Sequence, residues 1–247
     1  MKKILLILSL LLLSTQFAFA VPTGTVAYYK LESNGTDSVG SNTLTETGIT
    51  YITGKINNGA KFGTKLLSSV SPIVGTGDWT VNFWASTTSS GVNQALLEMG
   101  SSTPSASKST LNVYVKTTNK LGVQVDNADI FTGTSTALVD GGLHMVTLKR
   151  CGTSYTLYVD NVVDTGFTYS GLTLGSDLWV LGFEQTALHW SWTGVMDEIA
   201  VFNNCLSASD ISYLYNSGSP TALQQYPYTL SSITNRFLGF FRIFRFR

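Results

Sequence analysis

Two adjacent acidic residues, Asp197 and Glu198, are the side chains in this sequence most suited to acid–base chemistry. They lie in the apolar run "GVMDEIAVF" (194–202), which reads as a β-strand. Retaining hydrolysis of a glycosidic bond needs two carboxyl groups about 5–5.5 Å apart on one side of the substrate. Neighbours on a strand point to opposite faces, and neither face of this run carries a second carboxylate. The spacing therefore predicts that this strand is not a hydrolase site.

The remaining reactive residue types form no recognisable catalytic motif. His144 lies in an alternating segment, where a packed structural role is expected, and His189 lies in a loop. The sequence contains no G-x-S-x-G, H-E-x-x-H or phosphate-binding loop. Two cysteines cannot complete a four-ligand zinc site, and one cysteine with a distant histidine does not indicate a thiol enzyme. We therefore expect a protein that is not an enzyme.

The first 20 residues have the pattern of a secretory signal peptide. Two lysines precede an apolar run at residues 4–13, and "AFA" precedes residue 21. The run is shorter than the ~20 residues of a membrane span, so we expect a secreted or cell-surface protein with no transmembrane span. Export permits a disulfide between Cys151 and Cys205. Two separate buried thiols remain the alternative, because the sequence does not give the Cα separation that a bridge needs.

Charge is distributed unevenly along the chain. Residues 21–235 hold 9 basic and 15 acidic residues, a net charge of −6, which argues against a nucleic-acid partner. The C-terminal tail, 221–247, ends in a run of phenylalanines and arginines with no acid. We expect this tail to contact an acidic surface, either a membrane surface or another subunit.

The elements that would position these residues are short alternating strands. In "DWTVNFWAS" (78–86), Trp79, Val81, Phe83 and Ala85 share one face. Turn signals at 117–119, 151–153 and 160–161 separate further alternating runs, which is typical of a β-sandwich or barrel.

A single helix is predicted near 208–216. Ser207 is the expected N-cap, and Asp210 stands at the position that completes a capping box. Leu206 and Ile211 have the spacing of a hydrophobic staple, and Gly218 is expected to stop the helix.

Five segments, in order over residues 25–215, resemble the laminin-G-like, concanavalin A-like lectin/glucanase jelly-roll family. The strongest are "TVNFW" (80–84), "HMVTLKRCGTSYTLYVDN" (144–161) and "MDEIAVFNNCLSASDISYLY" (196–215). The sequence departs from the family pattern at Leu143, Asn161 and Cys205. The resemblance implies an all-β jelly roll of two antiparallel sheets with one short C-terminal helix, over residues 21–220. Such folds serve as lectins, adhesins, glucanases and spacers, so function must come from a site.

A calcium site is implied by the resemblance, since many such proteins hold a structural calcium near the equivalent loop. Here the loop is "NGTDSVGSN" (34–42), whose oxygen-rich residues suit Ca²⁺. Asp37, Asn42 and Asp197 are the expected ligands. Two alternatives stay open for Asp197: a satisfied polar residue at a strand end, or a carboxylate paired with a backbone amide.

The loop "GFEQTALHWSWTG" (182–194) contains the candidate binding residues. Phe183, His189, Trp190 and Trp192 offer flat faces suited to stacking on sugar rings, although at least one tryptophan is expected in the core. We therefore predict a non-catalytic module whose partner is a carbohydrate or a cell-surface protein. The alternatives are a structural or adhesion protein without a sugar site and, third, a glucanase-like hydrolase.

Overall fold

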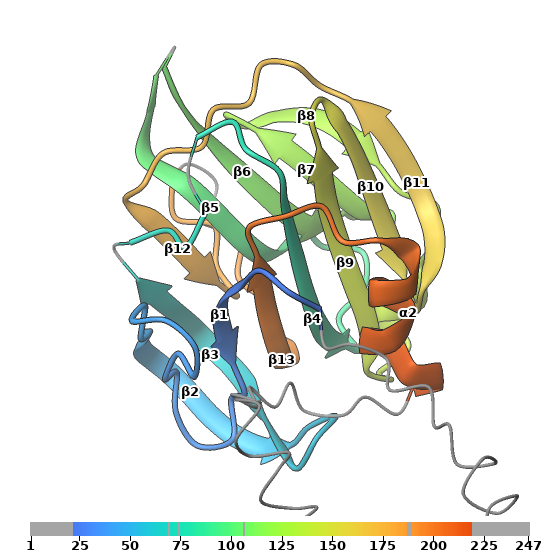
Figure 1. Cartoon of the computed structure of the whole chain (residues 1–247). Coiled ribbons are helices and arrows are strands. Elements are labelled where there is room, and N and C mark those ends of the chain that lie inside the picture. The colour runs from blue at the N-terminus through green and yellow to red at the C-terminus, as the bar shows by residue number, and fades with distance from the viewer. Residues whose placement is uncertain (1–21, 69, 74, 106, 187–188, 219–247) are drawn as a thin grey trace, which may run out of the picture.

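The computed structural model describes residues 22–68, 70–73, 75–105, 107–186 and 189–218 (Figure 1). The predicted signal peptide (1–20) and the predicted tail (221–247) lie outside the described residues. No helix in the described ranges is long and apolar enough to cross a membrane.

Antiparallel strands make up most of the described chain. In order they are β1 (Thr25–Tyr29), β2 (Thr45–Thr53), β3 (Asn58–Ser68), β4 (Trp79–Thr87), β5 (Gln94–Ser105), β6 (Lys108–Val115), β7 (Leu121–Val125), β8 (Ala128–Thr132), β9 (His144–Cys151), β10 (Ser154–Val159), β11 (Val162–Thr168), β12 (Leu178–Leu181) and β13 (Gly194–Phe202). The helical elements are η1 (Ala137–Val139), α2 (Ala208–Tyr215) and η2 (Asn216–Gly218). The strand order is β11-β10-β9-β4-β13-β3-β12-β5-β6-β7-β8, with β1 added to β13 and β2 to β3.

The sheet folds over on itself into two packed layers (Figure 1). One layer contains β1, β4, β9–β11 and β13, and the other contains β5–β8 and β12. Tyr29 of β1 and Trp179 of β12 stack across the interior with ring centroids 6.5 Å apart. Phe131 of β8 and Phe167 of β11 stack at 4.7 Å, so the two end strands meet and the sheet is nearly closed. This arrangement confirms the predicted all-β jelly-roll sandwich.

Alternation along β4 divides its side chains between two cores. Trp79, Val81, Phe83 and Ala85 lie in the large core between the layers, as the sequence predicts. Trp84 points the other way into a smaller cluster beneath α2, which we call the outer cluster. It contains Tyr28, Trp84, Met145, Tyr158, Ala200, Phe202, Leu206, Ile211 and Leu214. The helix therefore covers an apolar patch that the outer face of the sheet would otherwise expose.

The predicted turns, the helix near 208–216 and its N-terminal cap are confirmed, but Asn216 and not Gly218 ends the helix. Asp160 and Asn161 adopt φ of 50° and 66°, as a two-residue hairpin loop requires. Ser207 and Asp210 form the reciprocal capping box. The helix stops at Asn216, whose left-handed φ of 41° ends it before Gly218, because asparagine tolerates this conformation.

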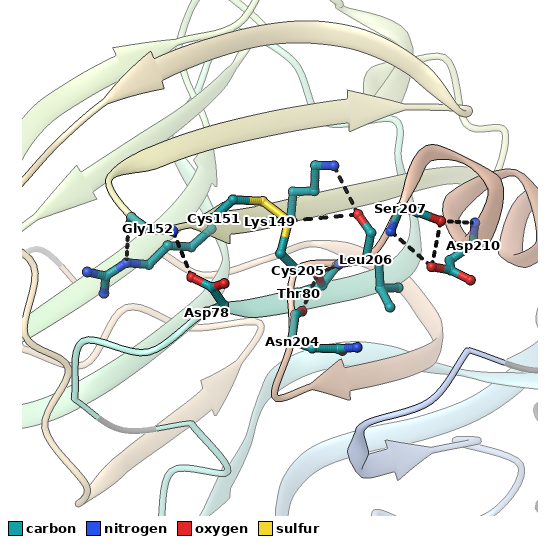
Figure 2. Close-up of a disulfide and its surroundings, with 11 residues drawn as sticks. Asp78, Thr80, Lys149, Cys151, Gly152, Asn204, Cys205, Leu206, Ser207 and Asp210 are labelled. Atoms are coloured by element: carbon teal, nitrogen blue, oxygen red, sulfur yellow. Dashed lines mark hydrogen bonds between the residues drawn. A yellow bond between two sulfur atoms is a disulfide. The ribbon is translucent and has the colours of Figure 1, made fainter.

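A disulfide joins Cys151 at the end of β9 to Cys205 in the segment before α2 (Figure 2). Their Cα atoms lie 5.3 Å apart, so the alternative of two separate thiols does not hold. The bridge closes a sequence separation of 54 residues, which a loop-entropy model values at about 4 kcal/mol. The same segment is fixed by Thr80, whose Oγ1 donates to the Asn204 carbonyl and accepts from the Leu206 amide.

Candidate functional site

The acidic pair lies in a β-bulge of β13, which places both side chains on the outer side of the sheet. The pairing of β13 with β4 shifts register between Asp197 and Ala200, and Glu198 adopts a left-handed φ of 51°. Asp197 stands opposite Trp84, and Glu198 contacts Tyr28; both partners belong to the outer cluster. The prediction that the two acids point to opposite faces is therefore wrong, because the extra residue of the bulge resets the alternation.

Asp197 is a fully buried carboxylate that caps backbone amides. Its Oδ2 accepts hydrogen bonds from the Lys55 and Ile56 amides at 2.7 and 3.0 Å. Its Oδ1 accepts from the Glu198 amide at 2.9 Å. These bonds attach the turn between β2 and β3 to β13 and hold the bulge in shape. Of the alternatives that the sequence left open, the structure shows pairing with backbone amides.

Glu198 retains one oxygen without a partner. Its Oε2 accepts a hydrogen bond from the Tyr28 hydroxyl, whereas its buried Oε1 has no partner among the described residues. Burial raises the pKa of Glu198 to about 7, and the charge of Asp197 adds to this rise. Burial also raises the pKa of Asp197 to about 7, despite the three amide donors. Three amides thus compete for Asp197, the second carboxyl group that glycoside hydrolysis at this position would use.

Asp37 and Asn42 lie together in one loop, where Asp37 accepts several backbone hydrogen bonds. The donors are the amides of Tyr28, Val39, Gly40 and Asn42, at 3.0 to 3.2 Å. Three of these amides donate to Oδ1 and one donates to Oδ2, so backbone N–H groups take up most of the acceptor capacity of Asp37. The Asn42 carbonyl accepts from the Tyr29 hydroxyl at 3.0 Å.

The third predicted calcium ligand, Asp197, belongs to a different part of the sheet. Strand β1 separates the two sites, since Tyr29 bridges to Asp37 on one side and pairs with Ile199 of β13 on the other. The described residues contain no group of three or more His, Cys, Asp or Glu side chains that could hold a metal. Amide N–H groups directed at both carboxylates do not fit a cation. The calcium site therefore gains no support from this geometry and stays a prediction.

His144 connects two carboxylates at the start of β9. Its Nδ1 lies 2.5 Å from Asp160 Oδ2 and its Nε2 lies 3.1 Å from Asp140 Oδ1. Burial alone would lower the pKa of His144, but Asp160 and Asp140 together raise it above its ordinary value. These contacts join the ends of the β9–β10 hairpin, in agreement with the expected structural role.

The aromatic candidates in the 182–194 loop separate into one core residue and three at the surface. Trp192 is 1% exposed and lies in the large core, so it cannot stack on a sugar and its assignment as a binding residue is wrong. Phe183 and Trp190 are half-buried and His189 is exposed. All five tryptophans of the sequence are described, and Trp190 is the one that is not buried.

The three surface candidates are held by stacking. Trp190 lies on the ring of Tyr114 of β6, with centroids 4.9 Å apart and an interplanar angle of 28°. Phe183 stacks on His189 at 5.8 Å, and the Lys65 ammonium lies 5.2 Å from the Phe183 ring centroid. We call Phe183, His189 and Trp190 the aromatic patch: all three belong to one loop, with Trp190 on Tyr114 of β6 and Phe183 beside Lys65 of β3.

Two buried acids, not anticipated from the sequence, anchor the backbone of this loop. Glu98 of β5 accepts hydrogen bonds from the Gln185 amide at 2.6 Å and from the Thr186 hydroxyl at 2.5 Å. Glu184 accepts from the His189 amide at 2.6 Å. Burial raises the pKa of Glu98 although these hydrogen bonds oppose the rise. A charged residue inside the apolar run "ALLEMG" (95–100) was the signal that could have identified Glu98.

Glu98 begins a row of polar side chains across four neighbouring strands. Glu98 stands opposite Asn112, Asn112 opposite Gln124, and Gln124 opposite Asp129. Asp129 accepts hydrogen bonds from the Tyr114 hydroxyl at 2.5 Å and from Lys116 Nζ at 2.7 Å. Burial alone would raise the pKa of Asp129, but hydrogen bonds from Lys116, Tyr114 and Gln124 lower it. The row lies beside the aromatic patch, because Tyr114 follows Asn112 by two residues on the same face.

A separate open groove of about 600 Å³ lies across β3, β4 and β13. Its lining is rich in hydroxyl groups and small residues, and comprises Ile52, Lys61, Phe62, Ser86, Thr87, Thr88, Ser89, Gly141, Thr193, Gly194 and Val195. Phe62, its one aromatic residue, is 2% exposed and presents no open ring face. The groove can hydrogen-bond a polar ligand but lacks a stacking surface.

Comparison with known protein families identifies the superfamily to which the chain belongs. Residues 58–212 match the family model described as the concanavalin A-like lectin/glucanases superfamily. The match covers more than half of the chain, so the chain belongs to this superfamily, as the sequence resemblance implied. A search of curated proteins finds no match.

Solved structures with a similar fold include three distinct proteins. Domain 4 of AbnA, an extracellular arabinanase from Geobacillus stearothermophilus solved with arabinotriose, matches with a TM-score of 0.62 and 15% identity, covering 78% of this chain and 98% of that one. The binding domain of Paraclostridial Mosquitocidal Protein 1 matches with a TM-score of 0.61 and 13% identity, covering 78% of this chain and 52% of that one. Trypanosoma rangeli sialidase matches with a TM-score of 0.64 and 17% identity, covering 80% of this chain and 33% of that one. The chain thus spans about a third of the sialidase, and identities this low establish the fold alone.

Proposed function

We propose that this chain is a secreted, non-catalytic module that binds carbohydrate through the aromatic patch formed by Phe183, His189 and Trp190. The superfamily contains lectins, and the similar arabinanase domain was solved with a trisaccharide. The predicted signal peptide supports secretion, as does the disulfide, a bond that persists in oxidising compartments. These points support a secreted carbohydrate-binding protein, and the aromatic patch supports the location of its binding site.

The observation that carries the proposal is the placement of Trp190. The other four tryptophans are buried at 2% exposure or less, whereas Trp190 is half-buried on a surface loop. Tyr114 supports one side of its indole, and the buried acids Glu98 and Glu184 fix the backbone on which it is mounted. A rigid aromatic face loses little conformational freedom when it binds, which suits recognition of a flat sugar ring.

The proposal is tested by a glycan array with the wild type and Trp190→Ala. We expect the wild type to retain at least one glycan class and Trp190→Ala to lose about tenfold or more in affinity, roughly 1.4 kcal/mol. Tyr169→Ala, a change at another half-buried aromatic residue outside this loop, is the matched control and should bind normally. A folded wild type that retains no glycan would indicate a structural or adhesion protein instead.

A hydrolase is the second candidate, and one observation favours it. Asp197 and Glu198 share a face, and the pKa of each is about 7, in the range of a working acid or base. We expect no release of reducing sugar from β-glucans, because Asp197 is engaged by three amides. Turnover by the wild type that Glu198→Gln abolishes, while Glu46→Gln leaves it intact, would establish the enzyme.

A further inference from the structure

Two buried amide side chains beside the aromatic patch have unmet hydrogen-bonding capacity. Asn112 of β6 is 4% exposed, and neither its Oδ1 nor its Nδ2 has a partner among the described residues. Gln124 of β7 is 6% exposed, and its Oε1 is likewise without a partner in the described part of the chain. Native structures leave few buried polar atoms unsatisfied, and each such atom calls for an explanation.

The two amides occupy the middle of the polar row, whose ends are satisfied. At one end, Glu98 accepts hydrogen bonds from the Gln185 amide and the Thr186 hydroxyl. At the other end, Asp129 accepts hydrogen bonds from the Tyr114 hydroxyl and the Lys116 ammonium. The contrast shows that this face is not poorly packed as a whole. The unmet capacity is confined to two facing side chains, next to the residue on which Trp190 stacks.

The chemistry of the row selects the class of ligand. An amide offers both a carbonyl acceptor and N–H donors, which matches hydroxyl groups that donate and accept at once. Phosphate or carboxylate would stand beside the carboxylates of Glu98 and Asp129 and would be repelled. A neutral compound rich in hydroxyl groups meets the amides without this penalty.

We infer that Asn112 and Gln124 form the hydrogen-bonding half of the site and bind hydroxyl groups of a neutral saccharide whose ring packs on Trp190. The inference rests on the proposed function and adds the ligand class and the residues that select it. At 4% exposure Asn112 is covered in this structure. A sugar therefore reaches its amide only when the side chains that cover it shift, and binding changes the environment of the neighbouring Trp190.

Thermal melting without any sugar tests whether the amide is truly unsatisfied. Asn112→Leu keeps the size of the side chain and removes its polar atoms, so this variant should melt at or above the wild-type temperature. Asn82→Leu is the matched control. Asn82 is also a buried asparagine on a central strand, but its Nδ2 donates to Thr147 Oγ1 at 2.6 Å. This control should melt well below the wild type.

Sugar binding by the same variants tests the role in recognition. The probes are neutral oligosaccharides (arabinotriose, cellotriose, mannotriose) and anionic ones (sialic acid, trigalacturonate). We expect the wild type to bind a neutral probe and Asn112→Leu and Gln124→Leu each to weaken that binding tenfold or more. Acrylamide quenching of tryptophan fluorescence should fall on binding, since Trp190 is the one accessible tryptophan of the five.

The outcomes separate this inference from the proposed function. If Trp190→Ala loses the sugar while Asn112→Leu and Gln124→Leu keep it, the aromatic patch binds and the amide row does not. If Asn112→Leu melts far below the wild type, the amide holds a structural water only and the inference fails. Preference for the anionic probes would also overturn it. Absence of binding to every probe by the folded wild type removes both proposals together.

Discussion

Two regions of the molecule bury polar side chains, and they treat them in opposite ways. Around β1 and β13, Asp37 and Asp197 accept four and three backbone hydrogen bonds respectively. On the outer face of β6 and β7, Asn112 and Gln124 keep buried amide atoms without partners among the described residues. The first region, which acts as a scaffold, pairs Asp37 and Asp197 with backbone amides, although Glu198 Oε1 beside them has no partner among the described residues. The second region keeps amide capacity that only a bound molecule or water can meet.

This difference explains why the more reactive residues are the poorer candidates for function. Charged carboxylates are costly to bury, so the fold surrounds Asp37 and Asp197 with amide donors from adjacent loops. Neutral amides are cheaper to leave unmet, and a site can hold them ready for a ligand. We therefore propose that the unmet capacity of neutral amides, more than acidity, marks the binding site of this chain.

The largest expected effect comes from removing a scaffold carboxylate. Asp197→Ala leaves the buried amides of Lys55, Ile56 and Glu198 without their acceptor, at a cost of about 3 kcal/mol in unfolding free energy. For a domain of this size the melting temperature should fall by roughly 6–12 °C. Calorimetry of Asp177→Ala provides the control, because its bonds to the amide and hydroxyl of Ser102 lie at the exposed surface. If the melting temperature of Asp197→Ala falls no further than that of Asp177→Ala, the contrast between the two regions does not hold.

A second effect is a fall of stability with rising pH. Folded Glu198 and Asp197 have pKa values of about 7, whereas carboxyl groups of an unfolded chain titrate near ~4. The folded state therefore holds these protons more tightly, so their contribution is complete below pH ~4 and is lost as pH rises towards 7. Urea midpoints at several pH values should show this slope, and Glu198→Gln should reduce it.

His144 supplies the control for that slope, since its raised pKa acts in the same direction. Its contribution to stability is present below its ordinary value of 6.5 and is lost as pH rises through the higher folded pKa. His144→Asn should therefore remove the upper part of the slope and leave the part below pH 6.5. An unchanged slope in Glu198→Gln would show that the bulge does not bury a protonated acid.

The smallest effect concerns calcium, for which sequence and geometry predict different results. A calcium ion held by Asp37, Asn42 and Asp197 with a Kd of about 0.1 mM would add about 1.4 kcal/mol at about 1 mM calcium. That stabilisation would raise the melting temperature by roughly 3–6 °C. Because backbone amides already donate to both carboxylates, we expect EDTA to leave the melting temperature unchanged. A calcium-dependent rise that Asp37→Ala abolishes would show the scaffold region to be a metal site.

Local chemistry made much of the fold predictable from the sequence. Alternation assigned the inward face of β4, paired Asp160 and Asn161 marked a hairpin, and Ser207 with Asp210 marked the start of α2. The bulge at Glu198 was not predictable, because glutamate carries no signal for a left-handed φ and the strain is held by a distant turn. That one residue reversed the predicted facing of the acids.

The candidate site was only half predictable for a similar reason. The sequence singled out the loop and its aromatic residues, and it anticipated that a tryptophan there would be buried, but it could not say which one. Asn112 and Gln124 looked like ordinary polar positions of an alternating strand. Their burial follows from tertiary packing, and the neighbouring loop is itself held by a contact between Glu98 and Gln185, residues 87 positions apart.

A crystal structure of the protein with the neutral oligosaccharide that it binds best tests the central claim most directly. The account predicts a sugar ring packed on Trp190, with hydroxyl groups within hydrogen-bonding distance of Asn112 and Gln124. A sugar bound instead in the groove lined by Ser86 and Thr193 would contradict it, because the hydroxyl-rich groove and not the aromatic patch would then be the binding site.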